Sequence, residues 1–154
     1  MVAGRDAISP TIRQGEALPP SGAFDLTEMP VIFIIDDDPS MRTAIHNLLR
    51  SLGYEVQVHA SAEAFLQSGP SVQPWCIITD VRMPGMSGVE LQTRLRSGGS
   101  DVPFVFITAV PEEADSARAF SDGALCFLTK PVDEDALIQC LEMAVARRRD
   151  PQGK

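Results

Sequence analysis

From residue 31 onward the chain alternates short apolar runs with amphipathic stretches, and this alternation restricts its fold more than any other feature. Five apolar runs have the length and composition of buried strands: residues 31–35, 54–58, 75–79, 103–107 and 124–128. Between the first two runs, Ile45, Leu48, Leu49 and Leu52 recur at helical spacing. Strands that alternate with helices form parallel sheets, so we predict one α/β domain built from five βα units.

The length of 154 residues fits a single domain with extensions. Residues 1–30 contain four prolines and three glycines without helical or strand periodicity, and we expect a flexible N-terminal extension there. The domain itself is expected over residues 31–146, followed by a basic C-terminal tail over residues 147–154 that starts where the last helix frays.

Charge and composition exclude several classes of protein. A net charge of -8 argues against a nucleic-acid surface, which needs a positive footprint. No apolar run is long enough to span a bilayer and no secretory signal opens the chain, so we expect a cytoplasmic protein that does not enter a membrane. Cys76, Cys126 and Cys140 each lie among apolar neighbours, which favours small buried hydrophobic side chains over a disulfide or a metal site.

Acidic residues follow two of the predicted strands. Asp36 and Asp37 follow the first strand and Asp80 follows the third, while Thr108 ends the fourth and Lys130 comes shortly after the fifth. In an open parallel sheet, ligands bind beyond the carboxyl ends of the strands. If strands one and three are neighbours, the three carboxylates meet in one pocket with a lysine and a hydroxyl at its rim.

Carboxylates at such close range raise one another's pKa unless a cation neutralises them, and Mg²⁺ is the natural hard partner. Asp38 is expected outside this set, because Pro39 suits the first helical position and leaves Asp38 as the N-cap. The alternative interpretation is that all these acids are helix caps and solvated loop charges.

Four motifs carry a resemblance to a known family: the acid pair Asp36 and Asp37, the loop "DVRMPGMSG" from Asp80, Thr108 followed by Ala109, and Lys130 followed by Pro131. On these motifs, residues 31–146 resemble the receiver domain of bacterial two-component response regulators. The stretch "ITDVRMPGMSGVELQ", residues 78–92, is most similar to the branch of nitrogen-fixation-type transcription regulators. The resemblance implies a single flavodoxin-like (βα)5 fold, a doubly wound parallel sheet with strand order 2-1-3-4-5.

The resemblance also implies a chemistry. Asp80 would be the phosphoacceptor for a partner sensor histidine kinase, in a Mg²⁺-dependent reaction of a phosphorelay. Asp37, Asp80 and the backbone carbonyl of Arg82 would hold Mg²⁺, with Asp36 reaching it through water. Lys130 would pair first with Asp80 and then with the phosphoryl oxygens. Phosphoryl transfer asks mainly for positioning and charge neutralisation, which these residues supply.

A switch is implied as well. The hydroxyl of Thr108 would turn toward the phosphoryl group, and Phe127 would turn into the space thus opened. The fourth helix, fifth strand and fifth helix would then change as a face for a downstream effector or for a homodimer. We expect self-hydrolysis of the phosphoryl group without separate substrate turnover, and we expect Arg82 and Val110 to flank that group and slow its hydrolysis.

Two other functions are weighed against a signalling switch. Aspartate-nucleophile phosphatases carry a D-x-D motif. Here Arg82, not an aspartate, stands two positions after Asp80, which argues against an enzyme of that kind. The second alternative is the N-terminal receiver part of a two-domain DNA-binding transcription regulator. No helix-turn-helix follows, so this chain is not expected to bind nucleic acid directly.

Overall fold

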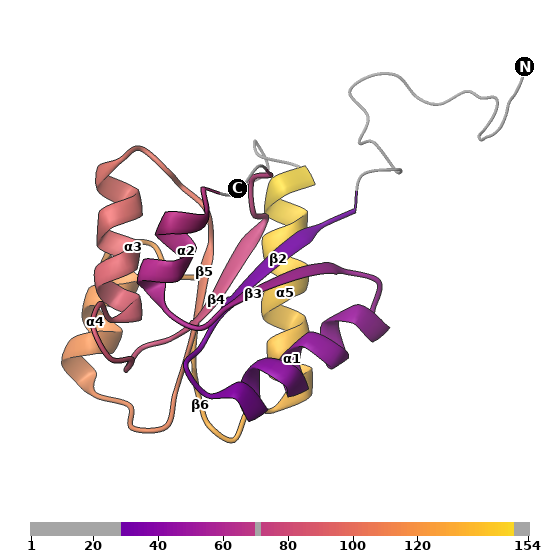
Figure 1. Cartoon of the computed structure of the whole chain (residues 1–154), viewed down its shortest axis with the longest axis horizontal. Helices are drawn as coiled ribbons and strands as arrows, with labels where there is room; N and C mark the ends of the chain where they lie inside the picture. Colours follow the sequence, from indigo (N-terminus) through magenta and orange to yellow (C-terminus); the bar gives the residue numbers. More distant parts are fainter. Residues whose placement is uncertain (1–28, 70–71, 150–154) are drawn as a thin grey trace, which may run out of the picture.

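The sheet is five-stranded, parallel and flanked by helices on both faces (Figure 1), and the computed structural model describes residues 29–69 and 72–149. Its strands are, in spatial order, β3 (Glu55–His59), β2 (Val31–Ile35), β4 (Cys76–Asp80), β5 (Phe104–Thr108) and β6 (Cys126–Thr129). Counted along the chain from β2, this is the order 2-1-3-4-5, so the predicted flavodoxin-like fold is confirmed. Most of the predicted extension, and the tail beyond Arg149, lie outside the described residues.

The helices are α1 (Pro39–Ser51), α2 (Ala62–Ser68), α3 (Gly88–Ser97), α4 (Glu113–Ser121) and α5 (Glu134–Arg149). Figure 1 shows α1 and α5 on one side of the sheet and α2, α3 and α4 on the other. Within the described residues no helix is long and apolar enough to cross a bilayer.

The helix ends follow the capping signals of the sequence. The Asp38 side chain accepts the Ser40 N–H at 2.9 Å and Pro39 takes the first helical position of α1, so Asp38 is the N-cap as predicted. The Ser87 hydroxyl and the Glu90 side chain form a reciprocal capping box at α3. These caps fix where each helix leaves the carboxyl edge of the sheet.

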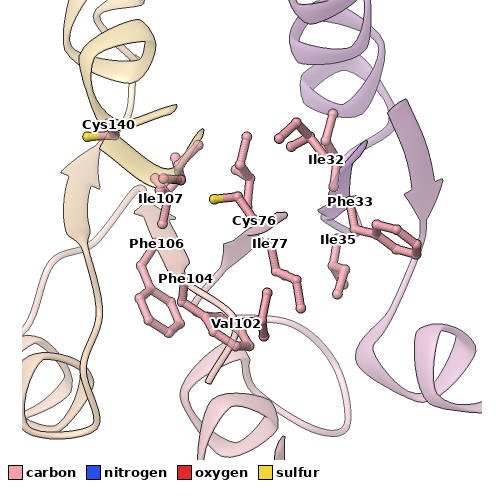
Figure 2. Packing of buried hydrophobic residues seen from close by; sticks show 14 of the residues in the cluster. Ile32, Phe33, Ile35, Cys76, Ile77, Val102, Phe104, Phe106, Ile107 and Cys140 are labelled. Atoms are coloured by element: carbon pink, nitrogen blue, oxygen red, sulfur yellow. The ribbon is translucent and has the colours of Figure 1, made fainter. Parts of the chain in front are cut away.

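The core lies on both faces of the three central strands. Every residue of β2, β4 and β5 is buried, and Figure 2 shows side chains such as Ile32, Ile77 and Phe106 filling the interior. The rings of Phe104 and Phe106 stack with centroids 5.5 Å apart. The edge strands β3 and β6 keep part of their side chains exposed, as expected for strands with one neighbour.

The prediction that all three cysteines are simple buried side chains is wrong for two of them. Cys126 and Cys140 are joined in a disulfide that links β6 to α5, with their Cα atoms 6.4 Å apart. Sequence spacing could not show this pair, because only the packing of α5 on the sheet brings the two residues together. Cys76 does fit the prediction: it is free and buried in β4.

Helix α5 continues to Arg149, so three arginines expected in a basic tail belong to the helix. The guanidinium groups of Arg148 and Arg149 lie 5.0 and 5.4 Å from the ring centroid of Trp75. The cationic end of α5 therefore packs on the sheet at the edge opposite the strand carboxyl ends.

Candidate functional site

Three carboxylates meet at the carboxyl ends of neighbouring strands. Strands β2 and β4 are paired with Ile35 opposite Thr79, so Asp36 and Asp80 leave the sheet side by side. One carboxylate oxygen each from Asp36, Asp37 and Asp80 lies within 4.8 Å of the others. Asp36 and Asp80 are only 2% and 7% exposed, whereas Asp37 is open to solvent. The sequence prediction that these distant residues form one cluster is confirmed.

Lys130 places its ammonium group inside this cluster from the loop after β6. Its Nζ lies 3.0 Å from Oδ2 of Asp80 and 3.3 Å from Oδ2 of Asp36. The backbone N–H of Lys130 donates to the carbonyl of Thr108 at 2.8 Å, and the bond between Lys130 and Pro131 is cis. One cation thus serves two buried carboxylates.

The electrostatics of the cluster leave negative charge in excess. Burial raises the pKa of Asp36, an effect that the Asp38 N–H and Lys130 only partly offset and that the charge of Asp80 reinforces. Burial lowers the pKa of Lys130, but its hydrogen bond to Asp80 and the charge of Asp36 outweigh burial, so that pKa lies above its usual value. Lys130 therefore stays charged, and the three carboxylates keep a net negative charge that a further cation could neutralise.

Backbone groups hold the carboxylates in place. The N–H of Asp38 donates to Oδ1 of Asp36 at 2.9 Å, and the N–H of Arg82 donates to Oδ1 of Asp80 at 3.1 Å. Because the second oxygen of Asp80 receives the Lys130 ammonium, the orientation of this carboxylate is fixed from both sides. The Arg42 guanidinium donates to the carbonyl of Asp36 at 2.7 Å and anchors the turn into α1.

Thr108 and Phe127 lie on the adjacent strands β5 and β6. Thr108 is buried at the end of β5, one residue beyond the partner of Asp80 in the sheet, and its hydroxyl accepts the Val110 N–H at 3.3 Å. The half-buried ring of Phe127 packs between Phe106, at a centroid distance of 6.0 Å, and Phe120 of α4, at 6.5 Å.

The Arg82 side chain turns toward α4. Its Nη2 contacts Glu112 Oε1 at 2.5 Å and Asp115 Oδ2 at 2.6 Å. The loop after β4 is therefore tied to the start of α4 by two ion pairs. From the sequence we expected Arg82 to flank the phosphoryl group, and we did not predict its ion pairs with Glu112 and Asp115.

Two supporting residues were missed from the sequence. The Glu63 carboxylate of α2 accepts a hydrogen bond from the Met86 N–H at 2.7 Å. This bond lowers the pKa of Glu63 and holds the loop between β4 and α3 in place. At Gly88, an added Cβ would lie 2.3 Å from the Asp80 carbonyl oxygen, so only glycine allows α3 to start this close. Glu63 is 23 residues from its partner, and no local pattern announces that contact.

The family model of the response regulator receiver domain matches residues 32–142. The chain belongs to this family. Receiver domains are signalling modules of two-component systems, which is the function class that the motifs implied.

Two curated relatives come from Bradyrhizobium diazoefficiens. The transcriptional regulatory protein FixJ is 37% identical over 123 residues, covering 80% of this chain and 60% of FixJ. Nodulation protein W is 36% identical over 128 residues, covering 83% of this chain and 56% of that protein. The chain thus spans little more than half the length of these relatives, and its receiver domain is similar to those of the FixJ-type branch.

Solved structures agree with this placement. The crystal structure titled FixJ-N has a TM-score of 0.69 and 34% identity, covering 76% of this chain and 94% of that one. Full-length FixJ from B. japonicum has a TM-score of 0.72 and 35% identity, covering 80% of this chain and 61% of that one. The receiver domain therefore shares both fold and sequence with the FixJ branch.

Proposed function

We propose that the receiver domain is phosphorylated on Asp80 by a partner sensor histidine kinase, as the response regulator of a cytoplasmic phosphorelay. The observation that carries this proposal is the Asp80 carboxylate, oriented by the Arg82 N–H and by Lys130 within a cluster of three acids. A carboxylate needs such support, because its charge must be offset before it can attack an anionic phosphoryl group.

In the proposed transfer, an Asp80 oxygen forms a bond to phosphorus while the bond from phosphorus to the kinase histidine nitrogen breaks. The histidine leaves as neutral imidazole after taking up a proton, and Asp80 becomes an acyl phosphate. Lys130 keeps its position and exchanges the Asp80 oxygen for a phosphoryl oxygen. The buried ammonium thereby neutralises charge on the group that moves.

The donor set fits Mg²⁺. Three carboxylates with one ammonium among them leave a net negative pocket of hard oxygen atoms, which is the ligand type this ion prefers. Asp37, Asp80 and the backbone carbonyl of Arg82 would hold the ion, and Asp36 would reach it through water. When bound, Mg²⁺ would neutralise the phosphoryl oxygens and the attacking carboxylate.

The proposed output is a change in the face formed by α4, β6 and α5, called the output face below. Thr108 leaves its contact with Val110 to donate its hydroxyl to the phosphoryl group, and Phe127 turns inward. Phe120, which is 50% exposed on α4 and touches Phe127, would feel this movement directly. The output face then binds a downstream effector or a second copy, until self-hydrolysis restores the resting state.

Phosphorylation can be tested with acetyl phosphate and Mg²⁺. We expect intact-mass spectrometry to show one added phosphoryl group on wild type and on Asp38→Asn, which keeps a capping side chain at an acid outside the cluster. Asp80→Asn should take up none. Equal labelling of wild type and Asp80→Asn, or no labelling of wild type, would contradict the proposal.

A second candidate is the receiver part of a two-domain DNA-binding transcription regulator. The relative lengths favour it, since FixJ is described as a transcriptional regulatory protein and this chain covers 60% of it. A gel-shift assay separates the two: residues 1–154 alone should not retard DNA, with or without phosphorylation, whereas a regulator in which a DNA-binding domain follows the receiver should.

A further inference from the structure

A pair of cysteines lies on the output face, outside the acidic cluster. Cys126 opens β6 and Cys140 lies in the middle of α5, and their sulfur atoms are joined. Figure 2 shows Cys140 well apart from Cys76, which lies among the buried side chains of the central strands. The pair therefore connects two of the three elements of the output face and leaves the third cysteine out.

We infer that Cys126 and Cys140 are a redox-responsive modification site that reversibly ties β6 to α5. The cellular setting of the pair follows from the proposed function, on which this inference rests. A phosphorelay regulator works in a reducing compartment, where disulfides are rare and, when present, are usually transient and redox-sensing. A bond in such a chain marks a site that forms and opens, not a permanent structural link.

The site is reachable by a small reagent. Both cysteines line a surface cavity of about 490 Å³ with Gln139 and Met143, and the Met143 side chain is 49% exposed. Cys126 itself is only partly buried. Cys140 is also buried, but it borders the same cavity as Cys126. Cys76 is fully enclosed, and burial raises the pKa of its thiol to about 12, so it stays a protonated, unreactive thiol.

The position of the pair explains what its oxidation would do. Successive side chains of β6 point to opposite faces of the sheet: Cys126 faces α5, and Phe127 faces α4 through Phe120. The disulfide thus holds β6 on the face of the sheet opposite to the face on which Phe127 lies. When it is closed, β6 and α5 can move only together, and the response of the output face is restrained.

The oxidation is a thiol–disulfide exchange with a small-molecule disulfide. The Cys126 thiolate attacks one sulfur of that disulfide, which forms a mixed disulfide and releases one thiolate. The Cys140 thiolate then attacks the Cys126 sulfur and releases the second. The two protons lost by the protein thiols go to the two thiolates released, so the protein gives up two electrons and the reagent becomes two thiols.

The test equilibrates the full chain with mixtures of reduced and oxidised glutathione, alkylates it under denaturing conditions and maps the peptides without reduction. We expect oxidising mixtures to protect Cys126 and Cys140 from alkylation and to yield a single disulfide that joins them within one chain, while Cys76 is always alkylated. Alkylation of all three cysteines throughout, or a link that involves Cys76 or two chains, would overturn the inference.

A stability measurement gives a second readout. Closing a loop of this size constrains the unfolded chain, so the Tm of the oxidised protein should lie roughly 10 °C above that of the reduced protein. The shift should persist in Cys76→Ala, the matched control, and vanish in Cys126→Ala and in Cys140→Ala. An unchanged Tm in wild type would contradict a link that restrains the fold.

Hydrogen exchange separates failure of this inference from failure of the proposed function. With beryllofluoride and Mg²⁺, the reduced protein should change its exchange in α4, β6 and α5, and the oxidised protein should change less. Equal responses in both forms would overturn the restraint. If the reduced protein takes up no phosphoryl group on Asp80 from acetyl phosphate, the proposed function is overturned instead. The peptide map and the Tm would still decide whether Cys126 and Cys140 form a reversible disulfide.

Discussion

At the scale of single residues, the acidic cluster is a compromise between folding and charge. Asp36 is almost fully buried beside Asp80, and Lys130 is the cation that approaches both. The raised pKa of Asp36 means that the folded state holds its proton more tightly than the unfolded chain does. Its ionisation therefore costs folding free energy in the absence of a metal ion.

We predict that Asp36→Asn is more stable than wild type in the presence of a chelator at pH 7, by about 1 kcal/mol. The contribution of a carboxyl with a raised pKa is present below its ordinary pKa of 3.8 and is lost as pH rises through the folded-state value. The difference between the two proteins should therefore shrink as pH falls toward that range. Urea unfolding at a series of pH values measures it, and a less stable Asp36→Asn at pH 7 would contradict this account.

Gly88 offers a steric prediction at the same scale. Gly88→Ala should lower the free energy of unfolding by about 1–3 kcal/mol, since its Cβ would press on the Asp80 carbonyl oxygen. Gly98→Ala is the matched control, because its Cβ meets only ordinary contacts at 3.6 Å and its φ of -85° suits alanine. Urea unfolding of both variants should separate them, and equal losses would show that Gly88 is not a required close contact.

At the scale of elements, Arg82 joins the loop after β4 to the first turn of α4. Its two acidic partners, Glu112 and Asp115, hold the guanidinium away from any role at the phosphoryl group in the resting state. The residue proposed to shield the phosphoryl group is thus also the one that holds α4. Phosphorylation would make these two tasks compete.

We therefore predict opposite effects of two changes on the lifetime of phosphorylated Asp80. Arg82→Asn removes the shield and should speed hydrolysis, whereas Glu112→Gln with Asp115→Asn frees Arg82 for the phosphoryl oxygens and should slow it. Each change is expected to be roughly twofold to fivefold, the scale of an exposed ion pair. Decay of the radiolabelled protein measures both, with Glu113→Gln as the charge-matched control. Changes in the same direction would rule out this competition.

At the scale of the whole molecule, metal binding should register as stability. An Mg²⁺ concentration about 100-fold above its Kd stabilises a protein by about 2.7 kcal/mol, so the Tm of wild type should rise by several degrees. Asp37→Asn should lose this rise without harm to the fold, because Asp37 is exposed. Asp38→Asn should keep it. A rise that survives in Asp37→Asn would place the ion elsewhere.

Most of the fold could be predicted from the sequence, because the signals involved are local. The apolar runs at β2, β4 and β5 and the caps at Asp38 and Ser87 depend on residues within one element. The strand order came from the family resemblance, since periodicity alone does not say which strands are neighbours.

The site divides along the same line. The acid cluster and the position of Lys130 could be predicted because the carboxyl ends of parallel strands share one edge. The Glu63 contact, the Arg82 ion pairs and the disulfide between Cys126 and Cys140 could not. Each depends on how one helix or loop packs on another, and side chains of ordinary type at unremarkable spacing give no sign of it.

The strand β6 is bonded in the described sheet to β5 alone. At its carboxyl end it leads to Lys130, which contacts Asp36 and Asp80. At its start it carries Cys126, which is bonded to Cys140 of α5. If Asp80 is phosphorylated as proposed, β6 could therefore shift at the edge of the sheet while the three inner strands keep their register. A rigid central sheet with one adjustable edge strand can suit different partner proteins, because the surface that they would contact is separate from the core that keeps the domain folded.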